Sequence, residues 1–271
     1  MRPGLIAVLA ATALVGPLAT GCAAQASPPR PAAQASTPQP DGAGSGWTLV
    51  SNDSGSDIYD TWSIDPPFTG ADCTTPGKVS LDSHGDVELE SNGSDDDCAE
   101  VSSPPIVSPT STREVFIEYR ADLPTDSWNA LWATGDPGPN PTTGEIDTAE
   151  MLGDSNQCTT FHFGPVGAGD HLGSACRSYR SATWATYGVA WMPGTLTFYV
   201  NGTKWLSWSS SDITGAPEQI VMDNLTAGWD KYGVLQCSEG GSPGKPPLAA
   251  GCYPPATTML VSYVRVWSRA H

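Results

Sequence analysis

The fold is indicated most directly by one stretch, Leu196-Thr197-Phe198-Tyr199-Val200-Asn201-Gly202-Thr203-Lys204-Trp205-Leu206. Large apolar side chains occupy every second position before Asn201-Gly202. Those two residues tolerate the positive φ angles that a tight hairpin turn requires. Large apolar side chains return at Trp205 and Leu206. The stretch therefore predicts two antiparallel strands joined by a two-residue turn.

The same two-residue periodicity occurs elsewhere in the chain. In Val115–Ala121 four side chains share one face, those of Val115, Ile117, Tyr119 and Ala121, whereas Glu118 and Arg120 lie on the other. No segment has a convincing helical period, and 29 Gly with 25 Pro favour turns between short strands. These features predict an all-β fold, an antiparallel sandwich or barrel. Further strands are expected at Val79–Leu81 and Val87–Leu89, around a turn at His84-Gly85, and at Met259–Trp267.

Composition and charge exclude several classes of function. The 271 residues include 12 basic and 29 acidic side chains, which gives a formal net charge of −17. Such a chain repels phosphate backbones and anionic lipid headgroups, so nucleic acids and membrane surfaces are poor partners. Neutral or cationic partners fit better. The ten Trp suit a protein that packs a core and also holds sugar rings.

The N-terminal region has the features of an export signal. Residues 1–21 combine Arg2 with an apolar run, Leu5–Ala19, that is too short to span a bilayer. The sequence Leu18-Ala19-Thr20-Gly21-Cys22 resembles a bacterial lipobox, with Cys22 as the lipidated residue. An ordinary signal peptide with an incidental Cys22 is the alternative. We therefore expect an exported protein, either anchored at the cell surface through Cys22, which would be its only membrane contact, or secreted.

Two further regions follow the signal. Residues 22–46 are rich in Ala, Pro, Gln, Ser and Gly and predict a disordered tether. Residues 47–271 are long enough for one domain, expected to be monomeric. Six cysteines remain beside Cys22, and export favours disulfides among them. Fifteen pairings are open, and sequence proximity favours Cys73 with Cys98, Cys158 with Cys176, and Cys237 with Cys252.

The candidate chemistry lies in Gly144-Glu145-Ile146-Asp147-Thr148-Ala149-Glu150-Met151. On a regular strand Glu145 and Asp147 share a face, but Glu150 points the other way. A β-bulge around Thr148-Ala149 would turn Glu150 onto the face of the other two acids. Crowded carboxyls raise at least one pKa, which suits a protonated acid beside an ionised nucleophile. A solvated acidic strand or a calcium-binding loop would fit the same residues.

Glu145–Glu150 resembles the bulged Glu-x-Asp-x-x-Glu signature of glycoside hydrolase family 16, the laminarinase-type branch. Four other segments resemble family strands in the same order: Trp128–Trp132, Tyr187–Trp191, Phe198–Gly202 and Val261–Trp267. The resemblance therefore covers most of Trp47–Trp267. The family fold implied is a β-jelly-roll sandwich of two antiparallel sheets with a concave substrate cleft. The resemblance implies that Glu145 is the nucleophile and Glu150 the acid/base. Asp147 would hydrogen-bond Glu145 and keep the two glutamates in different protonation states.

The resemblance also implies a set of substrate-binding residues. Trp128 and Trp132, four apart on one strand, would line the cleft, although ordinary core packing fits them too. His162 would lie near the cleft or serve as a core residue, and Trp229 would form the floor of a subsite. Arg120 would bind sugar hydroxyls, although Phe116 replaces the first arginine of the family strand. Trp191, within an apolar run, is expected in the core.

The predicted activity is endo-acting hydrolysis of β-1,3-glucan with retention of configuration. Mixed-linkage glucans and galactans are alternative substrates, and an acidic protein disfavours sulfated ones. A non-catalytic glycan-binding lipoprotein and a structural adhesin are rival functions. No cofactor and no metal ion are expected, and Ser262 stands where relatives have a calcium-binding aspartate, which disfavours structural calcium.

Overall fold

The structure is a computed structural model that describes residues 39–64, 78–91, 98–106, 108–125, 127–135, 144–152, 156–164, 171–178, 184–225 and 256–271. Contacts divide the chain into two units, Met1–Ser36 and Thr37–His271, and every described residue belongs to the second. The expected signal segment 1–21, Cys22, Cys73, Trp229, Cys237 and Cys252 lie outside the described residues. No described helix is long and apolar enough to cross a membrane.

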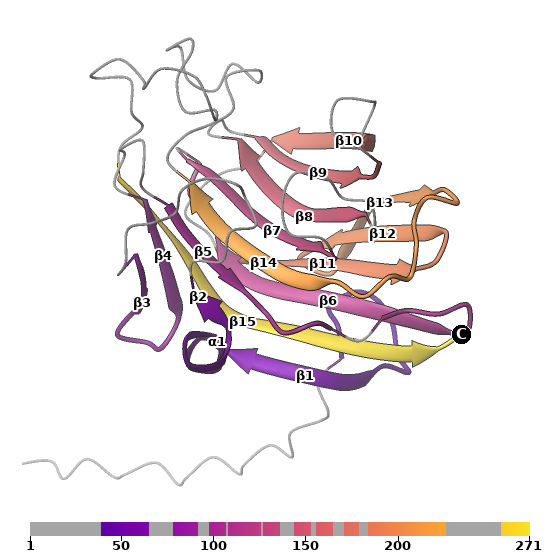
Figure 1. The fold of residues 1–271 in the computed structure, drawn as a ribbon, viewed down its shortest axis with the longest axis horizontal. Coiled ribbons are helices and arrows are strands. Elements are labelled where there is room, and N and C mark those ends of the chain that lie inside the picture. Colours follow the sequence, from indigo (N-terminus) through magenta and orange to yellow (C-terminus); the bar gives the residue numbers. More distant parts are fainter. Residues whose placement is uncertain are drawn as a thin grey trace, which may run out of the picture. The chain divides into compact units, whose positions relative to one another are not determined.

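The described strands form two antiparallel sheets (Figure 1). In sheet A the order is β13 (Thr203–Ser209), β12 (Thr195–Val200), β11 (Ala185–Met192), β6 (Arg113–Asp122), β15 (Thr257–Ala270), β4 (Val87–Ser91) and β3 (Val79–Leu81), and β1 (Thr48–Ser54) also pairs with β15. In sheet B it is β10 (His171–Ser178), β9 (Asn156–His162), β8 (Glu145–Leu152), β7 (Trp128–Thr134), β14 (Gln219–Leu225), β5 (Cys98–Ser102) and β2 (Ser63–Ile64). The predicted sandwich of two antiparallel sheets is confirmed.

The core lies between the two sheets. On β6 the four apolar side chains predicted to share a face are all fully buried, and they belong to the same cluster as residues of β8 and β7. Burying each large side chain contributes about 1.5–3 kcal/mol. Trp191 is 1% exposed and its indole donates to the carbonyl of Thr214, which confirms it as a core residue. The outer face of sheet B is thereby left for function, whereas the outer face of sheet A carries a second, smaller apolar cluster around Phe116.

The predicted hairpins are present. Asn201 and Gly202 join β12 to β13 with φ angles of 48° and 71°, the positive pair that a type I′ turn requires. Strands β3 and β4 pair around the expected His84-Gly85 turn. The strand order along sheet A therefore begins with a sequence-local unit and extends to β6 and β15 through long-range pairing.

One short helix, α1 (Gly55–Thr61), was not expected from the sequence. Ser54 caps it, because its hydroxyl accepts from the amide of Asp57 while the Asp57 carboxylate accepts from the amide of Ser54. This reciprocal capping box satisfies two amides that a helix start leaves unpaired. Seven residues are too few for a period to be visible, so the cap was the only available signal.

The chain enters the sandwich across the outer face of sheet A. The amide of Asp41 donates to Glu118 on β6, and the hydroxyl of Thr186 on β11 donates to the carboxylate of Asp41. Trp47 packs edge-on against Phe116, with ring centroids 5.6 Å apart. Residues from Gln39 onward, at the C-terminal end of the predicted tether 22–46, therefore already contact the domain, and the bounds of the tether stay a prediction.

Candidate active site

Strand β8 places the three acids near the centre of sheet B. Gly144 precedes it with a φ of 104°, and a Cβ at this position would lie 3.0 Å from the ring of Phe161. Glycine is therefore required where the chain turns into the strand. The inward side chains Ile146, Ala149 and Met151 are fully buried in the core. The acids are left for the outer face of the sheet.

The predicted bulge is present at Thr148. On the β7 side Trp132 pairs with Asp147 and Leu131 pairs with Ala149, so Thr148 has no partner there. On the β9 side the register also shifts between Asp147 and Glu150. The carbonyl of Thr148 accepts a hydrogen bond of 2.7 Å from the hydroxyl of Thr159 instead. The extra residue changes the alternation of the strand, and Glu150 joins Glu145 and Asp147 on the outer face.

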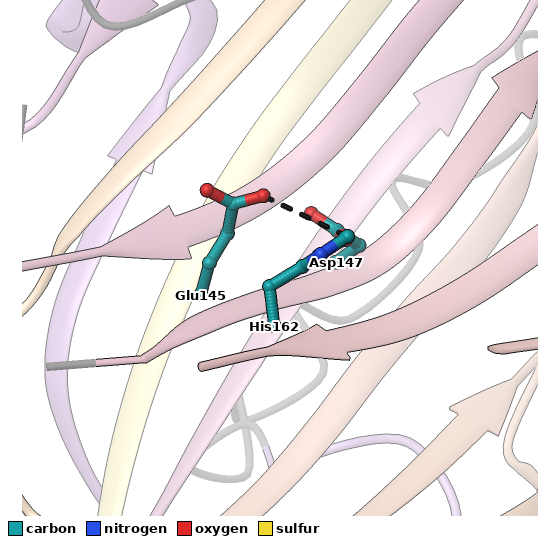
Figure 2. A group of neighbouring side chains, drawn as sticks. All are labelled: Glu145, Asp147 and His162. Atoms are coloured by element: carbon teal, nitrogen blue, oxygen red, sulfur yellow. Dashed lines mark ion pairs between the residues drawn. The ribbon is translucent and has the colours of Figure 1, made fainter. Parts of the chain in front are cut away.

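His162 completes a compact group with two of the acids (Figure 2). It lies opposite Glu145 in the pairing of β8 with β9. Its Nε2 is 3.2 Å from Oδ2 of Asp147 and 3.9 Å from Oε1 of Glu145. Burial lowers the pKa of His162, but the hydrogen bond and charge of Asp147, with the charges of Glu145 and Glu150, raise it to about 9. The imidazolium form therefore prevails at neutral pH and offsets part of the acidic charge.

The two tryptophans of β7 share the outer face with the acids. The indole Nε1 of Trp128 donates to Oε1 of Glu150 at 2.8 Å. The indole of Trp132 donates to Asp223 on β14 at 2.7 Å. Trp132 is 7% exposed and packs with Ala130 and Val221, so it forms part of the floor beneath the site face. Stacking of either ring on sugar stays a prediction.

Arg120 does not join this group. It projects from β6 on the outer face of sheet A, and its guanidinium lies over the ring of Trp184 at 5.8 Å. The acids lie on sheet B, so Arg120 lies apart from them, and its predicted sugar contact stays a prediction. Sequence periodicity could not foresee this separation, because it assigns a residue to one face of a strand but does not identify the sheet.

One predicted disulfide is present, between Cys158 and Cys176. These two residues face each other on β9 and β10, and Cys158 is also the pairing partner of Glu150. Cross-linking therefore ties the edge strand to the part of the sheet that carries the acids. For Cys73–Cys98 and Cys237–Cys252 the side chains lie outside the described part of the chain, so these pairings stay predictions.

The sequence reading missed buried acids around the site. Asp223 is 2% exposed; burial first, and then the charge of Glu100, raise its pKa well above the ordinary value. Burial and the charge of Glu145 likewise raise the pKa of Glu218. Asp223 directly follows the apolar run Ile220-Val221-Met222, but this pattern does not identify its partner Trp132. The two groups favour the neutral form, which limits the repulsion that they exert on Glu145, Asp147 and Glu150.

A metal ion could be held by the same atoms that form the compact group. Glu145, Asp147 and His162 each offer one ligand atom, and these atoms lie within 4.8 Å of one another. A cation there would compete with the proton on His162. The predicted absence of a cofactor and of calcium at Ser262 stays a prediction.

Comparisons with known proteins agree with this geometry. Residues 112–232 match the family model described as Glycosyl hydrolases family 16. The matched segment contains β6 to β14 and with them all three acids and His162. The match supports a glycoside hydrolase of family 16. A search of curated proteins finds no match to this chain.

Solved β-glucanases share the fold. An endo-β-1,3-glucanase from Pyrococcus furiosus matches with a TM-score of 0.58 and 18% identity, over 83% of this chain and 95% of that one. The catalytic domain of a laminarinase from Thermotoga petrophila RKU-1 matches with a TM-score of 0.60 and 17% identity, over 83% and 99%. A mixed-linkage glucan family 16 protein of Bacteroides ovatus matches with a TM-score of 0.56 and 18% identity, over 76% of this chain and 94% of that one. These likenesses identify the family 16 jelly roll as the fold.

Proposed function

We propose that this protein is an exported, endo-acting β-glycoside hydrolase of family 16 that cleaves β-1,3-glucan with retention of configuration. The observation that carries the proposal is the bulge at Thr148, which places Glu145 and Glu150 on one strand face with Asp147 between them. A nucleophile and a proton donor can then act on one glycosidic bond.

The first step forms a covalent intermediate. The carboxylate of Glu145 attacks the anomeric carbon, and the glycosidic carbon–oxygen bond breaks. The leaving oxygen takes the electron pair of that bond and the proton of Glu150. Trp128 donates to Oε1 of Glu150 at 2.8 Å and thereby holds the carboxyl toward the outer face.

The second step releases the sugar. Ionised Glu150 takes a proton from water, and the water oxygen bonds to the anomeric carbon while Glu145 leaves as a carboxylate. Two inversions give net retention. The imidazolium of His162, 3.9 Å from Oε1 of Glu145, stabilises the anionic form of that carboxyl, and Asp147, 3.2 Å from His162, favours the imidazolium.

Unsulfated β-1,3-glucan is the preferred substrate in this proposal. Two of the similar structures carry β-1,3-glucanase names, and a formal charge of −17 disfavours sulfated polymers. The second candidate is a mixed-linkage glucan, which the name of the Bacteroides ovatus protein favours. Three acids crowded on one face argue against a purely glycan-binding protein. Repulsion among the carboxylates lowers the stability of the fold, and a protein that only binds glycans gains no catalysis from it. Export through residues 1–21, anchoring at Cys22 and a monomeric state belong to the same proposal.

The test compares the wild type with Glu145→Gln on laminarin, lichenan, agarose and chitin. Laminarin should be cleaved fastest, with reducing ends of the retained anomer by NMR. Glu145→Gln should lose about three or more orders of magnitude in kcat, because an amide is not a nucleophile here. Glu90→Gln, on β4 of sheet A, is the matched control and should keep full activity. Binding without turnover of every polymer by the wild type would contradict the proposal and favour a glycan-binding protein.

A further inference from the structure

Asp223 is a buried carboxyl beside the catalytic face that the proposed chemistry does not use. Pairing across sheet B places Glu150, Ala130, Asp223 and Glu100 in one row on four consecutive strands. The small Ala130 is the residue between Glu150 and Asp223. Asp223 is only 2% exposed, so a glycan on this face would not reach it.

The contact that Asp223 makes is with Trp132. Its Oδ2 accepts from the indole Nε1 at 2.7 Å, and its Oδ1 has no hydrogen-bond partner among the described residues. Trp132 in turn is the pairing partner of Asp147 on β8. A buried indole N–H needs an acceptor, and Asp223 supplies it from the strand on the far side of the tryptophan.

We propose that Asp223 is a positioning residue that fixes the indole of Trp132 on the catalytic face and thereby sets the affinity for the glycan. This inference rests on the proposed function. Asp223 acts through Trp132 and makes no contact with the substrate. Without this acceptor the indole would have to turn away or leave its N–H unpaired, and either change alters the floor beside Asp147.

The protonation state of Asp223 defines which substitutions should be tolerated. Burial and the charge of Glu100, its partner on β5, favour the neutral acid. A neutral acid accepts the indole N–H through its carbonyl oxygen. Asparagine has a carbonyl oxygen in a similar position and should replace aspartate, whereas leucine fills the volume without an acceptor.

The experiment measures KM and kcat on laminarin for Asp223→Asn, Asp223→Leu, Trp132→Phe and the double variant Trp132→Phe/Asp223→Leu. Asp223→Leu should raise KM about tenfold with little change in kcat, which corresponds to one buried hydrogen bond. Asp223→Asn should stay within about twofold of the wild type. The double variant should have the same KM as Trp132→Phe alone, because without the indole N–H there is no hydrogen bond for Asp223 to accept. Glu90→Gln is again the control.

A readout that needs no turnover separates this inference from the proposed function. Near-ultraviolet circular dichroism reports the environment of ordered aromatic side chains, Trp132 among them, so it should change for Asp223→Leu and not for Asp223→Asn. That pattern would support the contact even if the wild type cleaved no polymer. An Asp223→Asn variant as impaired as Asp223→Leu, or an Asp223→Leu variant with unchanged KM and unchanged dichroism, would overturn the inference. If Asp223→Leu fails to fold, the comparison of Asp223→Asn with Trp132→Phe decides, since only Trp132→Phe should raise KM.

Discussion

At the scale of single residues, the site depends on how one histidine offsets three carboxyls. His162 lies 3.2 Å from Asp147 and 3.9 Å from Glu145, with a side chain 25% exposed. The three acids and the histidine could be predicted as site residues from the sequence, because each lies in a segment that resembles a family motif. The role of Asp223 could not be predicted, because its hydrogen-bond partner Trp132 is 91 residues away in the chain.

The raised pKa of His162 predicts a pH-dependent stability. A pKa raised from 6.5 to about 9 gives a contribution that is complete below pH 6.5 and is lost as the pH rises through 9. The wild type should therefore lose up to about 3 kcal/mol of unfolding free energy relative to His162→Gln between pH 6 and pH 10. Urea denaturation at a series of pH values measures this difference. His84→Gln, at an exposed turn, should follow the wild type, and parallel curves for wild type and His162→Gln would refute the prediction.

At the scale of elements, the bulge of β8 determines which acids can act together. Its position could be predicted, because the odd spacing of Glu145 and Glu150 conflicts with a regular pleat and one extra residue resolves the conflict. Helix α1 could not be predicted in the same way, since seven residues show no period. Membership of a strand in sheet A or B, which placed Arg120 away from the site, is set by long-range pairing that leaves no local pattern.

Changing the length of β8 tests the bulge. Deleting Thr148 would restore continuous pairing with β7 and β9 and still leave Glu145, Asp147 and Glu150 on one face. The deletion should keep the fold and lose about 10²-fold or less in kcat, since the acids shift by a fraction of a residue. Inserting one alanine after Thr148 makes the spacing of Glu145 and Glu150 even, so a regular pleat keeps both on one face but places Glu150 two residues farther along the strand. That separation should abolish activity as Glu145→Gln does. Kinetics on laminarin with circular dichroism as the folding control measure both. An insertion variant more active than the deletion would contradict the arrangement.

At the scale of the whole molecule, the outer faces of the two sheets differ in what they carry. Sheet A packs its outer face with Trp47, Phe116 and Trp267, while sheet B leaves its outer face to the acids. The all-β class followed from period-two segments and turn residues. The order of strands in each sheet did not, because the pairing of β6 with β15 joins segments far apart in the chain.

The disulfide between Cys158 and Cys176 should stabilise the molecule from the edge of sheet B. It closes a loop with a sequence separation of 18, for which loss of unfolded-state entropy predicts about 3 kcal/mol. A double variant with serine at both positions should lower the free energy of unfolding by about that amount, measured in guanidinium. Ser178→Ala, exposed on the same strand, should leave it unchanged. Equal stabilities of the double variant and the wild type would show that β10 needs no cross-link.

Asp41 forms hydrogen bonds with Glu118 and Thr186, and these attach the chain near Gln39 to the outer face of sheet A. A fusion partner or a bead attached upstream of Gln39 therefore connects at the layer that lacks the acids. A long polymer can then still approach sheet B of an immobilised enzyme, so capture through the N-terminus suits a column for continuous digestion of insoluble glucan.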